Sequence, residues 1–101
     1  MEKKGLKIVW DTKAKEALKE IFTFIAGDNM NEAEKVIKSI LDSTRALAFY
    51  PDIHPIDRFK INNDGSYKAY EIYSYRISYK VQTEFIYILR LRHTSRNPFI
   101  Y

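Results

Sequence analysis

Positively charged side chains crowd the last part of the sequence. Arg90, Arg92, His93 and Arg96 lie within seven positions, and no acidic residue follows Glu84. Guanidinium groups bind phosphate and carboxylate oxygens through paired hydrogen bonds, and histidine exchanges a proton near neutral pH. The segment could therefore bind an anionic partner. It could equally be a strand whose solvent-facing side is basic.

The composition indicates one globular domain over residues 1–101. Apolar residues make up 46% of the chain and charged residues 30%, and the formal net charge is +4. Cysteine is absent, which excludes disulfides and thiolate metal sites and favours a reducing cytoplasm. The sequence shows neither a signal peptide nor about 20 apolar residues that could span a bilayer. We therefore expect a cytoplasmic domain without a membrane segment.

Hydrophobic periodicity predicts the elements that position these side chains. Residues 6–10 alternate as in a short strand, and apolar positions then recur at helical spacing over 14–25 and 33–48. The break at Gly27 is short, so the two helices should form an antiparallel hairpin.

Beyond Pro51 and Pro55 the hydrophobic period changes to two. The predicted strands are 66–73, 75–81 and 85–92, with a further possible strand at 57–61. This order, β-α-α-β-β-β with the optional extra strand, predicts an α+β domain. The helix hairpin should pack on one face of a mainly antiparallel sheet and leave the other face open.

Alternation within the strands assigns side chains to the two faces. The odd positions of 75–81 are apolar, so Arg76 and Lys80 should lie on the open face. In 66–73, Ala69 should face the helices, with Lys68 and Tyr70 on the open side. In the last strand the residues assigned to the open side are Ile86, Ile88, Arg90 and Arg92, and those assigned to the helix side are Phe85, Tyr87, Leu89 and Leu91.

The open face should then be strongly basic. Its predicted cations are Arg58, Lys60, Lys68, Arg76, Lys80, Arg90 and Arg92. A solvated sheet face is the simpler account of any one of them. Seven like charges on one face nevertheless repel each other unless an anion lies nearby, which favours an anionic partner.

Three stretches of the chain resemble a known family. VWDTKAKEAL, YKAYEIYSYRISYKV and IYILRLRHTSRNP are similar to the RelE/ParE superfamily of toxins from bacterial toxin–antitoxin modules, and the likeness in element order and spacing covers nearly the whole chain. RelE-like members cut messenger RNA in the ribosomal A site, whereas ParE-like members poison DNA gyrase. The resemblance also implies a cognate acidic antitoxin that folds over the basic face.

A RelE-like activity would imply a set of catalytic residues. Lys68 falls at the first of two family lysine positions, but Tyr70 occupies the second. Arg76 matches the middle arginine of the family, Arg96 the later arginine, and Tyr101 the terminal tyrosine. Arg76 and Tyr101 favour the nuclease, and Tyr70 argues against it.

The roles follow from the chemistry of RNA cleavage, which needs a base, charge stabilisation and an acid. Lys68 would be the base, Arg76 and Arg96 would hold the phosphate, and Tyr101 would stack on a nucleobase. His93 would be the acid, or else a strand-end histidine bonded to backbone. The residues expected to bind RNA are Arg58, Lys60, Lys80, Arg90 and Arg92.

Three hypotheses remain open from the sequence, which favours the first of them. The first is a metal-independent and cofactor-free mRNA endonuclease that acts with the ribosome, the second is a DNA gyrase poison, and the third is an inactive toxin fold that only binds an antitoxin. His54 and Asp57, even with His93, do not have the spacing of a metal site. The chain also lacks a nucleophile elbow and a glycine-rich phosphate loop.

Overall fold

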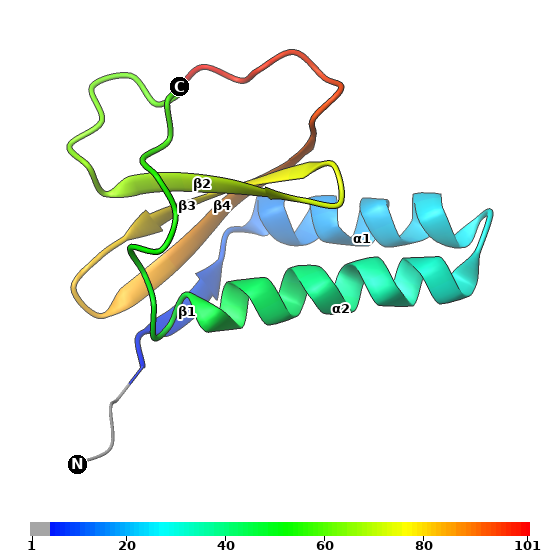
Figure 1. Cartoon of the computed structure of the whole chain (residues 1–101). Coiled ribbons are helices and arrows are strands. Elements are labelled where there is room, and N and C mark those ends of the chain that lie inside the picture. Colours follow the sequence, from blue (N-terminus) through cyan, green and yellow to red (C-terminus); the bar gives the residue numbers. More distant parts are fainter. Residues whose placement is uncertain (1–4) are drawn as a thin grey trace.

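The computed structural model describes residues 5–101 (Figure 1). Two helices and four strands follow one another as β1 (Lys7–Trp10), α1 (Thr12–Ala26), α2 (Met30–Ala46), β2 (Tyr67–Ile72), β3 (Tyr75–Val81) and β4 (Phe85–His93). The strands form one sheet in the order β1-β4-β3-β2, with β1 parallel to β4 and the other two pairs antiparallel. The predicted α+β class, helix hairpin and mainly antiparallel sheet are confirmed.

Local sequence explains where the helices begin. The Asp11 carboxylate accepts a hydrogen bond from the Lys13 amide at the start of α1, and the Asn29 side chain accepts one from the Glu32 amide at the start of α2. The apolar stripes of both helices lie against the sheet, with Ile40 fully buried. Burial of each such side chain stabilises the fold by about 1.5–3 kcal/mol.

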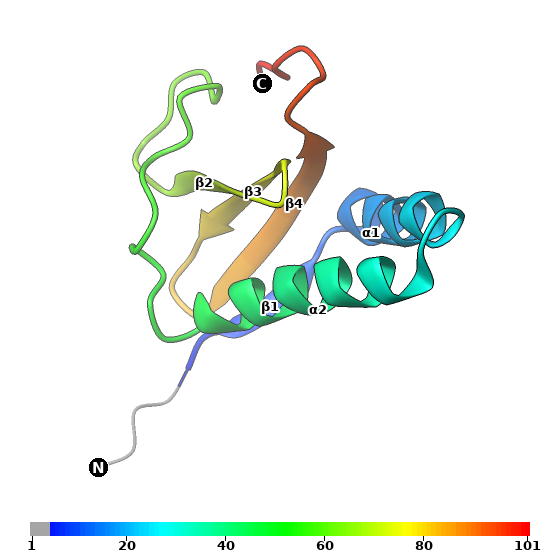
Figure 2. The same ribbon diagram turned by 45° about the vertical axis from the view of Figure 1, so that its right-hand side comes forward.

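The helix pair covers one face of the sheet, and the C-terminal segment lies near the opposite face (Figure 2). Strand side chains packed on the helices include Tyr75, Ile77 and Tyr79 of β3. The Tyr79 hydroxyl donates to the carbonyl oxygen of Pro51, which fixes the long connection between α2 and β2 to the core. No helix within residues 5–101 has the length and apolar character needed to cross a membrane.

The possible strand at 57–61 is not formed. Only Ile56 makes an isolated bridge, to Lys68, and the chain then turns. The Asp57 carboxylate accepts a hydrogen bond from the Phe59 amide, so this side chain supplies a local partner that a ladder would otherwise provide. The Asn63 side-chain amide donates to the carbonyl oxygens of both Asp57 and Tyr67 and closes the loop.

The predicted faces of β2 are reversed in the structure. Lys68 pairs with Tyr79 and Tyr70 pairs with Ile77, so both point toward the helices, whereas Ala69 lies on the open side opposite Ser78. Tyr70 is buried, and its hydroxyl shares a 2.6 Å hydrogen bond with Ser43 of α2. Burial of the large Tyr70 ring with a satisfied hydroxyl stabilises this register, which carries Lys68 to the same face.

A β-bulge in β4 overturns the assignment of its first half. Tyr79 pairs with Ile88 but Ser78 pairs with Arg90, so Leu89 is an extra residue. Before the bulge Ile86 and Ile88 face the helices with no exposed surface, and Phe85 and Tyr87 lie on the open side. After the bulge, Arg90 and Arg92 lie on the open face and Leu91 on the helix side, as predicted.

Candidate basic site

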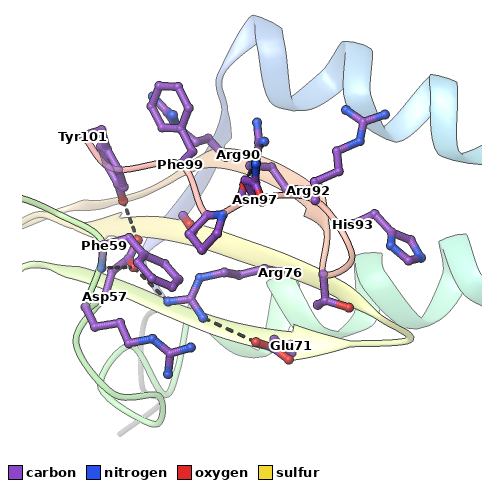
Figure 3. A pocket seen from close by; sticks show the side chains of 15 residues that line it. Asp57, Phe59, Glu71, Arg76, Arg90, Arg92, His93, Asn97, Phe99 and Tyr101 are labelled. Carbon is purple, nitrogen blue, oxygen red and sulfur yellow. Dashed lines mark hydrogen bonds and ion pairs between the residues drawn. The ribbon is translucent and has the colours of Figure 1, made fainter.

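The open face and the C-terminal segment enclose a cavity of about 110 Å³ (Figure 3). Its lining contains two acidic residues, Asp57 and Glu71, and an excess of arginines. The arginines are Arg58, Arg76, Arg90, Arg92 and Arg96. With five guanidinium groups against two carboxylates, the cavity is a positively charged environment.

Asp57 is the centre of a hydrogen-bond network on this face. Its carboxylate is 1% exposed and accepts hydrogen bonds from the Arg76 guanidinium at 2.8 Å, the Tyr101 hydroxyl at 2.7 Å and the Phe59 amide at 3.0 Å. Figure 3 shows Arg76 between Asp57 and Glu71. A buried carboxylate needs such partners because burial of an unpaired charge is costly.

Both terminal nitrogens of Arg76 are paired with carboxylates of the protein. Besides Asp57, it forms a 3.5 Å ion pair with Glu71, which is directly opposite in β2, and its guanidinium lies 4.7 Å from the centre of the Phe59 ring. Its Nε atom is buried without a hydrogen-bond partner. Two carboxylates therefore neutralise Arg76, which was expected from the sequence to hold a phosphate.

These contacts change the pKa values of Asp57 and Tyr101. Burial raises the pKa of Asp57, but hydrogen bonds from Tyr101, Arg76 and the Phe59 amide outweigh it, so the pKa lies below its usual value. The pKa of Tyr101 is raised, first by burial and then by its hydrogen bond to the Asp57 carboxylate. Tyr101 therefore stays protonated at neutral pH and donates a hydrogen bond to Asp57.

The lowered pKa of Asp57 predicts acid sensitivity. Ionised Asp57 stabilises the fold above its unfolded pKa of about 4, and this contribution is lost as the pH falls through the lower, folded pKa. In urea unfolding at a series of pH values below about 4, the unfolding free energy should fall more steeply for the native protein than for Asp57→Asn. The pKa values of Asp42 and Asp64 are also lowered, but both residues are present in both proteins. Parallel pH curves would contradict the prediction.

Residues 94–101, called the strap below, fold back over the open face. The Tyr101 amide donates to the Phe59 carbonyl at 3.0 Å, and the Ile61 amide donates to the Tyr101 carbonyl. The Phe99 ring lies 3.8 Å from the guanidinium carbon of Arg90. The Arg92 guanidinium donates to the Asn97 carbonyl at 3.2 Å, so the strap contacts β4 as well as the loop.

Four of the five residues assigned to catalysis line the same cavity, and only Lys68 lies apart from them. Arg76 and Tyr101 meet at Asp57, but Lys68 lies on the helix side of the sheet, 3.5 Å from Asp52. Its side chain is 12% exposed, and it does not line the cavity that Arg76 lines.

His93 and Arg96 lie at the end of the cavity. The His93 ring packs edge-on against Tyr75, and its Nδ1 is 2.7 Å from the Ser95 hydroxyl. In Figure 3 it points away from Arg76. Arg96 is exposed, and its amide donates to the His93 carbonyl. The structure thus gives His93 local hydrogen-bond partners of the kind expected for a strand-end histidine.

The residues predicted to bind RNA lie on the open face or on the loop beside it. Lys60 and Lys80 both lie 4.8–4.9 Å from the centre of the Tyr67 ring, and Arg58 lies 4.8 Å from that of Phe59. Arg90 and Arg92 follow on β4 and contact the strap. Each of these cations is paired with an aromatic ring of the same face.

Sequence reasoning missed Asp57 and Phe59 as organisers of this site. Asp57 was considered only as a metal ligand, and no group of three His, Asp or Glu side chains within residues 5–101 is arranged to hold a metal ion. The sequence does contain a local indication of this role. Aspartate side chains in turns commonly accept a hydrogen bond from the amide two residues later, as Asp57 does from Phe59.

Comparison with known proteins identifies a matching sequence family and a solved structure with a similar fold. Residues 8–98 match the model of the family described as the ParE toxin of the type II toxin–antitoxin system parDE. The fold is similar to a solved structure of the chromosomal ParDE TA system from P. aeruginosa, with a TM-score of 0.67 and 16% identity over 87% of this chain and 95% of the other. No curated protein matches the sequence.

Proposed function

Because the chain belongs to the ParE toxin family of type II toxin–antitoxin systems, we propose that it arrests growth by binding DNA gyrase and does not cut messenger RNA. The system implies a cognate antitoxin as its partner. The choice of gyrase as the target rests on the resemblance to ParE-like members, which share the fold but lack nuclease residues. The observation that carries the choice is the neutralisation of Arg76 by Asp57.

A nuclease needs a phosphate-binding cation that is free and a base within hydrogen-bond reach of the reacting hydroxyl. Arg76 already binds two carboxylates. Lys68, the expected base, is on the opposite face of the sheet from Arg76, so no single RNA segment on the open face contacts both. The Tyr101 hydroxyl donates a hydrogen bond to Asp57 and is held in place by it. The arrangement supports a toxin that acts through contact with another macromolecule.

The proposal is tested by supplying both targets to the purified protein. With gyrase, ATP and supercoiled plasmid, we expect accumulation of linear DNA covalently attached to gyrase after denaturation. With ribosomes and a translated messenger RNA, primer extension should show intact transcripts. Codon-phased cuts that require ribosomes, together with unaffected gyrase, would overturn the proposal in favour of the endonuclease.

A substitution at Lys68 separates the same two activities in cells. We expect Lys68→Met to remain as toxic as the native chain, because the aliphatic part of the side chain is kept and only a 3.5 Å ion pair with exposed Asp52 is lost. Growth after induction measures the outcome at matched protein levels. A folded Lys68→Met variant that no longer arrests growth would point back to a catalytic base.

A further inference from the structure

The strap covers the central cations of the open face. Arg90 lies beneath two strap rings, with its guanidinium carbon 3.8 Å from the centre of Phe99 and 4.4 Å from that of Tyr101. Ser78, which follows on the same face, is 5% exposed. An anionic chain laid along the sheet would meet the strap before it met these groups.

Asp57 places an internal anion on the same face. Its carboxylate holds Arg76 from within the protein, as the carboxylate or phosphate of a partner would from outside. The Tyr101 hydroxyl donates to the other oxygen of this carboxylate. One buried acid thus masks a cation and anchors the strap.

The anchorage of the strap is concentrated at its end. Tyr101 makes two backbone hydrogen bonds to the loop and the side-chain bond to Asp57. The preceding side chains contribute little burial, since Ile100 is 65% exposed and Phe99 43% exposed. Few buried contacts favour local opening without unfolding of the domain.

We propose that the strap is a gate over the basic face, held shut by the Asp57–Tyr101 hydrogen bond, and that an extended single-stranded nucleic acid must open it to reach Arg90. The gate goes beyond the proposed function, because it acts on access to the face and not on the identity of the target. A partner that binds only the open form has its affinity reduced by the fraction of molecules that are open. Weakening the Asp57–Tyr101 hydrogen bond should therefore increase the affinity for such a partner.

The sign of this effect separates the gate from the other role that the strap can have. If the strap were part of the binding surface, loosening it would weaken binding, since its contacts with the partner would have to be ordered first. The test uses Tyr101→Phe, which removes the hydroxyl and keeps the ring. The matched control is Tyr73→Phe in the exposed β2–β3 turn.

The probe is a fluorescent 12-nucleotide oligodeoxythymidine, whose binding to the full chain is followed by anisotropy at low salt. Tyr101→Phe should bind it up to about tenfold more tightly than the native protein, and the Ile61 and Tyr101 amides should exchange with solvent faster. Tyr73→Phe should match the native protein in both measurements. Unchanged or weaker binding by Tyr101→Phe would overturn the gate, as would unchanged amide exchange.

An engineered disulfide that holds the strap closed, and that can be reduced again, provides a second measurement. The hydrogen bonds of Tyr101 to Phe59 and Ile61 place Lys60 beside it, and the chain has no native cysteine. In a Lys60→Cys, Tyr101→Cys variant, the oxidised and reduced forms have the same composition apart from the disulfide. Oxidation should weaken oligonucleotide binding and reduction should restore it. Equal binding by the two forms would also overturn the gate.

Discussion

Replacement of Ile88 by glutamate should abolish cooperative folding, whereas Tyr87→Glu should leave the fold intact. Ile88 has no exposed surface and packs with Tyr79 in the core against the helices. A carboxylate there would lose its hydration without gaining a partner, at a cost of several kcal/mol out of a typical total of about 5–15 kcal/mol. Urea unfolding followed by circular dichroism measures the outcome.

The neighbouring substitution is the control because it changes the same strand on its other face. Tyr87 pairs with Lys80 on the open side, so a glutamate there gains an opposite charge across the strands. Tyr87→Glu should shift the unfolding free energy by less than about 1 kcal/mol. If Tyr87→Glu unfolded the chain and Ile88→Glu did not, the register on the turn side of the bulge would be wrong.

Removal of the Asp57 side chain should cost about 3 kcal/mol of stability. Asp57→Ala takes away the acceptor for Arg76, Tyr101 and the Phe59 amide together and leaves a largely buried guanidinium with only the distant Glu71. The expected loss is at the lower end of the range for broken buried pairs, because the Arg76 side chain is 18% exposed and water can reach it. The unfolding free energy in urea is the measurement.

Asp42→Ala is the matched control for this change. Asp42 also pairs with two cations, but these partners, Lys38 and Arg45, are 78% and 69% exposed, so its loss should cost far less than that of Asp57. In an Arg76→Met background, Asp57→Ala should be markedly less costly, since no cation is left unpaired. Equal losses in both backgrounds would show that Asp57 stabilises the fold without Arg76.

Periodicity predicted the elements well because it depends on burial along each segment. The two helices, their hairpin and the strands after Pro55 were all expected within a few residues. The faces of the first half of β4 were not, because one extra residue at Leu89 changes the alternation where the first five residues of the strand are all apolar. In β2 the error arose at Tyr70, whose hydroxyl finds Ser43 27 positions away and so can be buried.

The charge of the candidate site and the presence of Arg76 and Tyr101 in it were predictable, but the pairing of its groups was not. Arg90 and Arg92 lie on the open face as expected, but the partner that controls Arg76 comes from a loop 19 positions earlier, and Tyr101 reaches the same carboxylate from 44 positions later. Such pairings depend on tertiary structure, which alternation does not describe. A cation counted as available from sequence was therefore already neutralised.

The place of β4 in the sheet also sets the order in which the chain can fold. β4 is the last strand in sequence, yet it lies between β1 and β3, and Ile8 of β1 pairs with Ile86, 78 positions later. Closure of so long a loop is entropically costly and slows folding. On a ribosome, the helix hairpin must wait with its apolar stripe uncovered until β4 has left the exit tunnel. Until β4 is available, the exposed apolar stripe of the nascent chain favours association with other apolar surfaces.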